Sequence, residues 1–111
     1  MYHIKQDRRS RASADEIARG LNTCLKTMPL SAVTITDLHR ATGVSRATFY
    51  RLFDNIEDVL VYQCDQMLES MRDSCAENGI NRPYDAVRHM ILMSFDYLDF
   101  LEPMVKLLLV A

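Results

Sequence analysis

The sequence predicts an all-α fold, because few residues interrupt helices and the apolar residues have a helical spacing. The 111 residues include only three glycines and three prolines, so helices joined by short connections account for most of the chain. Apolar residues recur mostly three or four positions apart, which is the period of one helix face. No internal repeat or low-complexity segment divides the chain.

The first helix is expected over residues 13–27. Its apolar positions form one stripe, as in a helix that packs one face on a core: Ile17, Leu21, Cys24, Leu25 and Met28. Pro29 ends it, because a proline disfavours helical geometry in the residue before it.

Two short helices follow. Thr34 can cap the second, and Asp37, three residues later, can reach back to the cap. Gly43 ends that helix, since glycine adopts the left-handed conformation without a side-chain clash. Ser45 then caps a third helix over residues 46–53. Two short helices joined by three residues that include a glycine form a helix-turn-helix pattern.

A long fourth helix is expected from Asn55 to about residue 77, with Asn55 and Asp58 capping its start reciprocally. Its apolar seam consists of Ile56, Leu60, Cys64, Met67, Met71 and Cys75. A fifth helix runs over residues 83–101, with apolar side chains in nearly every direction, so other helices should enclose it. A sixth apolar segment spans 104–111, and it indicates either a longer chain or burial in a partner.

Charge divides the chain into two parts. Residues 1–53 carry nine Lys or Arg against four acids, whereas residues 54–111 carry four against eleven. The basic part suggests a polyanionic partner, and the acidic part would turn away from it.

The composition also excludes several classes of protein. No stretch of about 18 apolar residues occurs, and the first residues lack the apolar core of a secretory signal, so we expect a cytoplasmic protein with no membrane span. The three cysteines are read as small buried hydrophobes. No nucleophile paired with a base, glycine-rich phosphate loop or metal-ligand cluster is found, so we expect no enzyme, no cofactor and no metal site.

The third helix has two contrasting faces. Phe49, Leu52 and Phe53 share its inward face. The outer arc is short, basic and polar, and consists of Arg46, Ala47, Tyr50 and Arg51, with Thr48 on its edge. A DNA major groove about 12 Å wide admits such a helix, and an arginine can pair with a guanine edge through two hydrogen bonds. An ordinary solvated helix is the alternative from this segment alone.

Residues 34–53 resemble the DNA-binding region of TetR/AcrR-type bacterial transcriptional regulators. The resemblance is carried by the Gly-Val-Ser turn at 43–45, the Thr-Phe-Tyr-x-x-Phe run at 48–53 and the Glu-Asp-Val-Leu run at 57–60. It implies a three-helix, helix-turn-helix DNA-binding domain over 1–53. A long linking helix and the start of a helical regulatory bundle would follow over 54–111.

The resemblance implies contacts to DNA from eight residues: Thr34, Thr36, Ser45, Arg46, Ala47, Thr48, Tyr50 and Arg51. The two threonines would meet the backbone, with Thr36 also near a base. The four residues that open the third helix would enter the major groove, Tyr50 would hold a phosphate, and Arg51 would be a further contact. A basic tail before the first helix would lie in the minor groove or be disordered: Lys5, Arg8, Arg9 and Arg11.

Two positions depart from the family pattern. Ile56 stands where a phosphate-binding lysine is usual, so the backbone amides of the fourth helix remain there. His39 stands where a small residue is usual. If His39 points inward the two short helices must part slightly, and if it points outward it becomes a candidate phosphate contact.

The resemblance further implies a homodimer of the full-length protein on a palindromic operator, with double-stranded DNA released when a small-molecule effector binds, as in a repressor. Residues that would line an effector pocket, or form plain core instead, are Met67, Met71, Met90, Met93, Phe95 and Tyr97. The alternative function is a helical protein-interaction module that pairs with another regulator through its apolar C-terminus.

Overall fold

The computed structural model describes residues 2–95, 102 and 105, and it confirms the all-α prediction for them. Five α-helices and one short 3-10 helix occur there: α1 (Arg8–Leu25), η1 (Leu30–Ala32), α2 (Ile35–Thr42), α3 (Arg46–Leu52), α4 (Ile56–Glu77) and α5 (Pro83–Ser94). Within these described ranges the only extended pairing is an isolated antiparallel bridge between Tyr2 and Phe53. The sixth apolar segment lies outside them, apart from Val105, which is half exposed.

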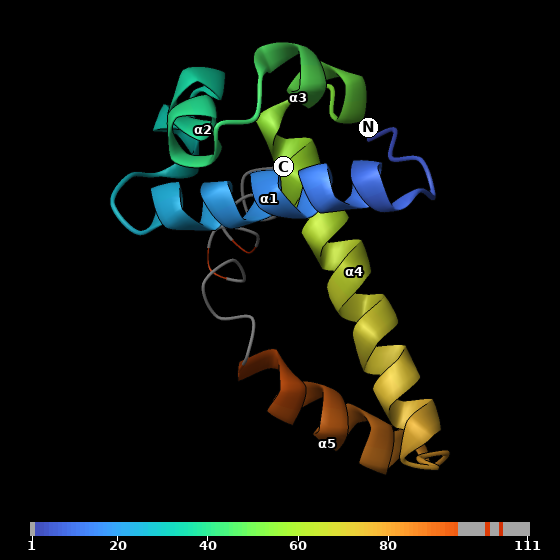
Figure 1. The fold of residues 1–111 in the computed structure, drawn as a ribbon. Coiled ribbons are helices and arrows are strands. Elements are labelled where there is room, and N and C mark those ends of the chain that lie inside the picture. Colours follow the sequence, from blue (N-terminus) through green and yellow to red (C-terminus); the bar gives the residue numbers. More distant parts are fainter. Residues whose placement is uncertain (1, 96–101, 103–104, 106–111) are drawn as a thin grey trace.

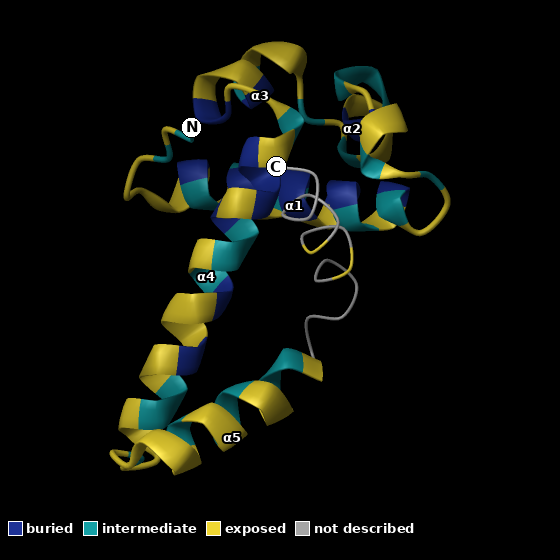
Figure 2. Cartoon of the chain, turned by 180° about the vertical axis from the view of Figure 1, so that it is seen from behind, coloured by how far each residue is buried: buried dark blue, intermediate teal, exposed yellow. Residues whose placement is uncertain are grey.

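The first three helices and the start of α4 pack around one core. α2 and α3 lie on the same side of α1, and α4 starts near α3, crosses α1 and runs away from it towards α5 (Figure 1). Buried residues gather where α1 meets the start of α4 (Figure 2). The largest side chains with almost no exposed surface are Ile17, Leu21, Phe49, Leu52, Phe53, Val59 and Leu60.

The first helix starts at Arg8, five residues earlier than expected, and ends at Leu25. The Asp7 carboxylate caps it by accepting from the Ser10 N–H at 2.7 Å. The prediction was wrong because residues 8–12 are mostly polar and give little periodic signal, although Ser10 is itself buried. The predicted basic tail is wrong for the same reason: Arg8, Arg9 and Arg11 belong to α1, and only Lys5 precedes it.

The predicted residues cap the next two helices. Thr34 and Asp37 form the capping box of α2. The helix ends at Thr42, and Gly43 follows it in the left-handed conformation with φ of 78°. Ser45 caps α3, which ends at Leu52, one residue earlier than expected. α2 approaches α1 closely, since a β-carbon on Gly20 would lie 2.2 Å from Cγ2 of Thr42.

The fourth helix ends at Glu77 as predicted and starts at Ile56, one residue later than expected, because Asn55 is its cap. It has 22 residues and a length of about 33 Å. The Asn55 side chain accepts from the Asp58 N–H at 2.9 Å, as predicted. The Asp58 carboxylate accepts from the Asp54 N–H at 3.2 Å, one residue before the Asn55 N–H that reciprocal capping predicted. All six seam residues are buried or half-buried.

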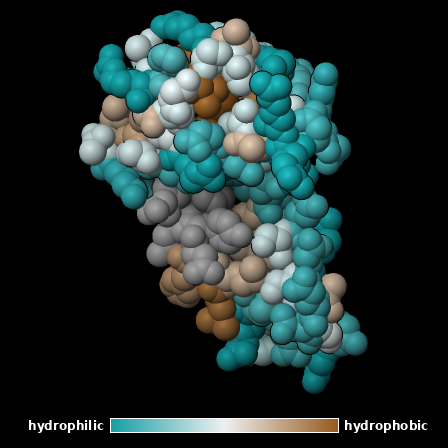
Figure 3. Space-filling model, in the orientation of Figure 1, coloured by the Kyte–Doolittle hydropathy of each residue, from teal (hydrophilic) through white to brown (hydrophobic). Residues whose placement is uncertain are grey.

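The prediction that other helices enclose α5 is wrong for its described part. α5 has no buried residue, and its hydrophobic side chains are exposed at Tyr84, Val87, Ile91 and Leu92, with Phe95 just beyond. Hydrophobic surface is visible at its C-terminal end in Figure 3. One neighbour, α4, covers one side only, through Met90 and Met93. In the described ranges no helix is both long and apolar enough to cross a membrane.

Candidate nucleic-acid interface

The outer face of α3 is exposed because its inner face supplies three core side chains. Phe49, Leu52 and Phe53 are 2%, 1% and 0% exposed. The polar and basic residues point away from them: Arg46, Ala47, Tyr50 and Arg51 are exposed, and Thr48 is half-buried. The two faces are those that the sequence spacing predicted. Burial of the inner face holds the outer face, a short cationic ridge, at a fixed angle to the core.

The first turn of α3 is fixed by two hydroxyls. Ser45 Oγ accepts from the Thr48 N–H at 3.1 Å. The same oxygen donates its proton to Thr48 Oγ1 at 3.0 Å. Both hydroxyls are therefore engaged in the cap, which aligns the start of the helix before any ligand arrives.

The side chain of Arg46 joins the two short helices. Its guanidinium donates a hydrogen bond to Oγ1 of Thr36, on the first turn of α2. Arg46 stays exposed, and Thr36 is half-buried. The sequence indicated both residues as separate DNA contacts and did not indicate that they touch, because that depends on side-chain conformations across two helices.

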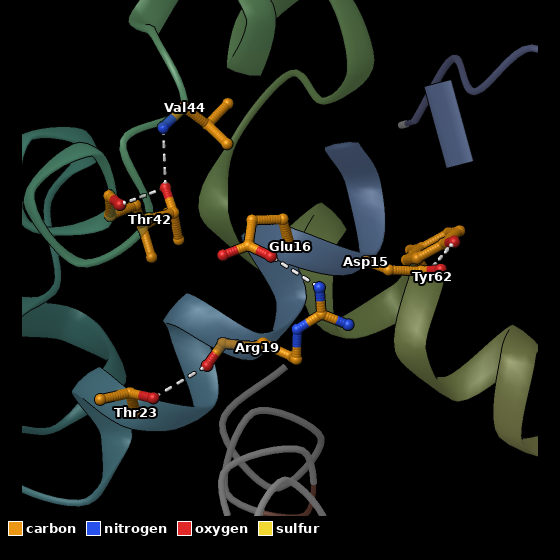
Figure 4. Close-up of polar contacts among 8 residues, drawn as sticks. Asp15, Glu16, Arg19, Thr23, Thr42, Val44 and Tyr62 are labelled. Atoms are coloured by element: carbon orange, nitrogen blue, oxygen red, sulfur yellow. Dashed lines mark hydrogen bonds and ion pairs between the residues drawn. The ribbon is translucent and has the colours of Figure 1, made fainter. Parts of the chain in front are cut away.

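Hydrogen bonds also hold the connection between α2 and α3. Thr42 Oγ1 donates to the Leu38 carbonyl at 2.7 Å and accepts from the Val44 N–H at 3.1 Å (Figure 4). His39 donates from Nδ1 to the Val44 carbonyl at 2.8 Å. His39 is exposed, so of the two orientations considered for it the outward one is found, and it braces the turn.

The remaining predicted contact residues lie around this ridge. Thr34 is exposed at the start of α2, where its Oγ1 accepts from the Asp37 N–H at 3.1 Å. Tyr50 is 54% exposed, and its ring packs edge-on against Phe49 with centroids 5.4 Å apart. That contact restricts the ring while its outer part faces solvent.

The N-terminal segment docks beside the end of α3, which sequence reasoning missed. The His3 N–H donates to the Leu52 carbonyl at 2.6 Å, and the His3 ring contacts Asp54 at 2.8 Å. That hydrogen bond lowers the pKa of Asp54 below its ordinary value. The alternation of Tyr2 and Ile4 with polar residues was the one signal for an extended segment packed on a core.

Polar contacts attach the start of α4 to α1. The Tyr62 hydroxyl donates to Asp15 at 2.6 Å (Figure 4), and Arg11 donates to Gln66 at 2.9 Å. Burial, together with the hydrogen bond to Asp15, raises the pKa of Tyr62 above its ordinary value. A displacement of this part of α4 would therefore pull on α1.

The predicted effector-pocket residues differ in their burial. Met67 and Met71 are buried in the core, and Met90 and Met93 pack against it. Phe95 is 62% exposed, and Tyr97 lies outside the described residues. A cavity of about 510 Å³ lies beside α4. Met93 lines it, among the polar side chains of Arg11, Gln66, Glu69, Ser70, Asp73, Ser74 and Glu77.

No candidate metal centre, meaning three or more suitable side chains together, is found in the part of the chain that the structure describes. All three cysteines are free thiols. Comparison of the chain with protein-family models, curated proteins and solved structures gives no match.

Proposed function

We propose that the chain binds double-stranded DNA sequence-specifically, as the helix-turn-helix part of a transcriptional regulator. The observation that carries this proposal is the exposed, basic and polar ridge of α3 above three buried core residues. A helix presented in this way fits a major groove. Residues 1–53 also carry the excess of positive charge that phosphates attract.

Arg46 is the residue assigned to base recognition, through the two acceptors of a guanine edge. Its contact with Thr36 pre-orients the guanidinium, which lowers the entropy lost on binding. Ala47 lets the helix approach the bases closely. Tyr50 and Arg51 would contact phosphates, and Thr34 would add a backbone contact at the start of α2.

The regulatory proposal is that α4 transmits an effector signal to this surface. Its start is attached to α1 by the Tyr62–Asp15 contact. In a homodimer on a palindromic operator, a shift of α4 would change the separation of the two α3 helices. An effector that binds the shifted form better would release the DNA, as in a repressor.

Arg46→Ala tests the DNA-binding proposal. Binding to the DNA flanking the chain's own gene is measured against scrambled duplexes over a salt series. We expect the variant to lose about 1 to 3 kcal/mol of preference for the cognate duplex. Arg88→Ala, at an exposed position on α5, is the matched control and should keep that preference. The absence of any preference in the dimeric unsubstituted protein rejects the proposal.

Tyr50→Phe separates phosphate from base contacts. Removal of a hydroxyl that meets only phosphate should weaken binding to all duplexes equally. A selective loss on the cognate duplex would instead assign Tyr50 to base recognition.

The exposed hydrophobic side chains of α5 support a second candidate function, a helical module that pairs with another regulator. Co-purification of a defined second protein, together with DNA binding that Arg46→Ala leaves unchanged, would favour this alternative.

A further inference from the structure

A partly open cavity of about 410 Å³ lies at the N-terminal end of the molecule. Figure 1 shows the N-terminal segment passing from beside the end of α3 to the start of α1. Residues of the N-terminal segment, of the start of α1 and of the end of α3 line the cavity, and they include Lys5, Arg9 and Arg51. We call it the N-terminal cavity. The DNA-binding proposal uses only Arg51 of these three side chains.

One acid, Asp7, lines the cavity beside the three cations. None of these cations forms an ion pair with another residue that the structure describes. Asp7 is engaged in capping α1 through Ser10. Its hydrogen bonds from Ser10, and the nearby charges of Lys5 and Arg51, lower the pKa of Asp7 below its ordinary value.

With Asp7 ionised, the side chains Lys5, Arg9 and Arg51 leave the cavity with two excess positive charges. Cations brought to one place by three different segments repel one another, and an anion bound between them removes that cost. The first N–H groups of α1 also lack intrahelical partners. Arginine is well suited to phosphate, because its planar group donates two parallel hydrogen bonds.

We propose that the N-terminal cavity binds a phosphate group through Lys5, Arg9 and Arg51. The phosphate comes either from a small molecule or from the backbone of the DNA that α3 is proposed to bind. Only the second source rests on the proposed function. Since Arg51 belongs both to the cavity and to the ridge of α3, a phosphate held there lies at one end of that ridge.

The first experiment uses inorganic phosphate and no DNA. Amide chemical shifts are followed during a phosphate titration at constant, low ionic strength, with chloride as the balancing anion. We expect saturable shifts at Arg9, Ser10 and Arg51. Arg9→Gln should weaken the affinity about tenfold, the usual effect of losing a hydrogen bond to a charged group. The control Arg88→Gln should leave it unchanged.

The proposal is overturned if the shifts do not saturate, or if Arg9→Gln and the control bind phosphate equally well. Lys5→Gln provides a second test, because Lys5 precedes α1 and contributes to no helix. It too should lower phosphate affinity severalfold. The spectrum of each variant also reports whether the fold is retained.

The second experiment distinguishes the two sources with duplex DNA. If the phosphate is that of the DNA backbone, Arg9→Gln should weaken binding to all duplexes and reduce the salt dependence by about one unit of slope. If duplex binding is unchanged while phosphate affinity falls, the source is a small molecule. A chain that binds phosphate but no duplex rejects the DNA-binding proposal and leaves the cavity site intact.

Discussion

Two regions of the molecule differ in how completely their helices are covered. The N-terminal unit, which we define as residues 2–62, contains α1 to α3 and the start of α4, and it holds all seven of the largest fully buried side chains. The C-terminal arm, residues 63–95, contains the rest of α4 and α5. Only Met67 and Met71 are buried in the arm.

The difference follows from the number of neighbours that each helix has. In the N-terminal unit, α1 contacts three other helices, so its apolar stripe is covered along its length. In the arm, α5 packs on α4 alone among the described helices with appreciable contact. When two helices pack only on each other, one side of each helix is covered and its other sides face solvent. Stability should therefore reside in the unit, and the arm should tolerate change.

The largest expected effect is on the free energy of unfolding, and it is tested by replacing one phenylalanine in each region. Phe53 is fully buried and contacts Phe49 and Tyr62 through its ring. Phe53→Ala should lower the free energy of unfolding by about 3 to 5 kcal/mol. Phe95→Ala, at a position 62% exposed, should change it by about 0.5 kcal/mol or less. Urea unfolding followed by circular dichroism measures both, and equal losses would break the contrast.

A second prediction concerns the contact between α1 and α2. Gly20→Ala places a methyl group against Cγ2 of Thr42 and should cost about 1 to 3 kcal/mol through overpacking. Thr42→Ser removes that methyl but keeps the hydroxyl that bonds Leu38 and Val44.

In the Thr42→Ser background, the sign of the Gly20→Ala effect should reverse. The steric cost is then absent, and alanine is favoured over glycine in a helix by up to about 1 kcal/mol. A double-mutant cycle measured by chemical unfolding gives the coupling. Additive effects would mean that Gly20 is needed for another reason.

The helix ends that the sequence predicted best depend on neighbours within a few positions. The cap of α2 is formed by Thr34 and Asp37, and that of α3 by Ser45, all from local hydrogen bonds. The start of α1 has an equally local cap at Asp7. The helix start was predicted from apolar periodicity, and the polar turn that follows Asp7 carries none.

Features that join distant parts of the chain were not predictable from the pattern. Docking of Tyr2 against Phe53 joins residues about fifty positions apart. The Arg46 contact to Thr36 requires two side chains on different helices to select matching rotamers. For the candidate site, the sequence thus predicted which side chains face outward and not which of them are held by one another.

A third prediction tests how the unit holds the start of the arm. Tyr62 is 3% exposed and donates to the exposed Asp15. Tyr62→Phe should cost about 1 kcal/mol, because Asp15 regains water when its partner is lost. Chemical unfolding measures the loss. Tyr84→Phe, 77% exposed on α5, is the control, and a loss of the same size there would mean that the hydroxyl of Tyr62 contributes nothing specific.

The smallest effect is expected at alkaline pH, at the boundary of the two regions. Tyr2 donates to Asp65, just beyond the N-terminal unit, and this hydrogen bond, with burial, raises its pKa from 10.0 to about 12. A phenol whose pKa is raised on folding stabilises the fold below its unfolded pKa, and this contribution is lost as pH rises through the folded pKa.

The free energy of unfolding should therefore fall between about pH 10 and pH 12, and Tyr2→Phe should remove the share of that fall due to Tyr2. Urea unfolding at the two ends of this range measures it, with Tyr84→Phe as the control. Since Tyr62 also has a raised pKa, part of the fall should remain in Tyr2→Phe. If Tyr2→Phe and Tyr84→Phe behaved alike, Tyr2 would not hold the arm to the unit, and the boundary between the regions would lie at Tyr62.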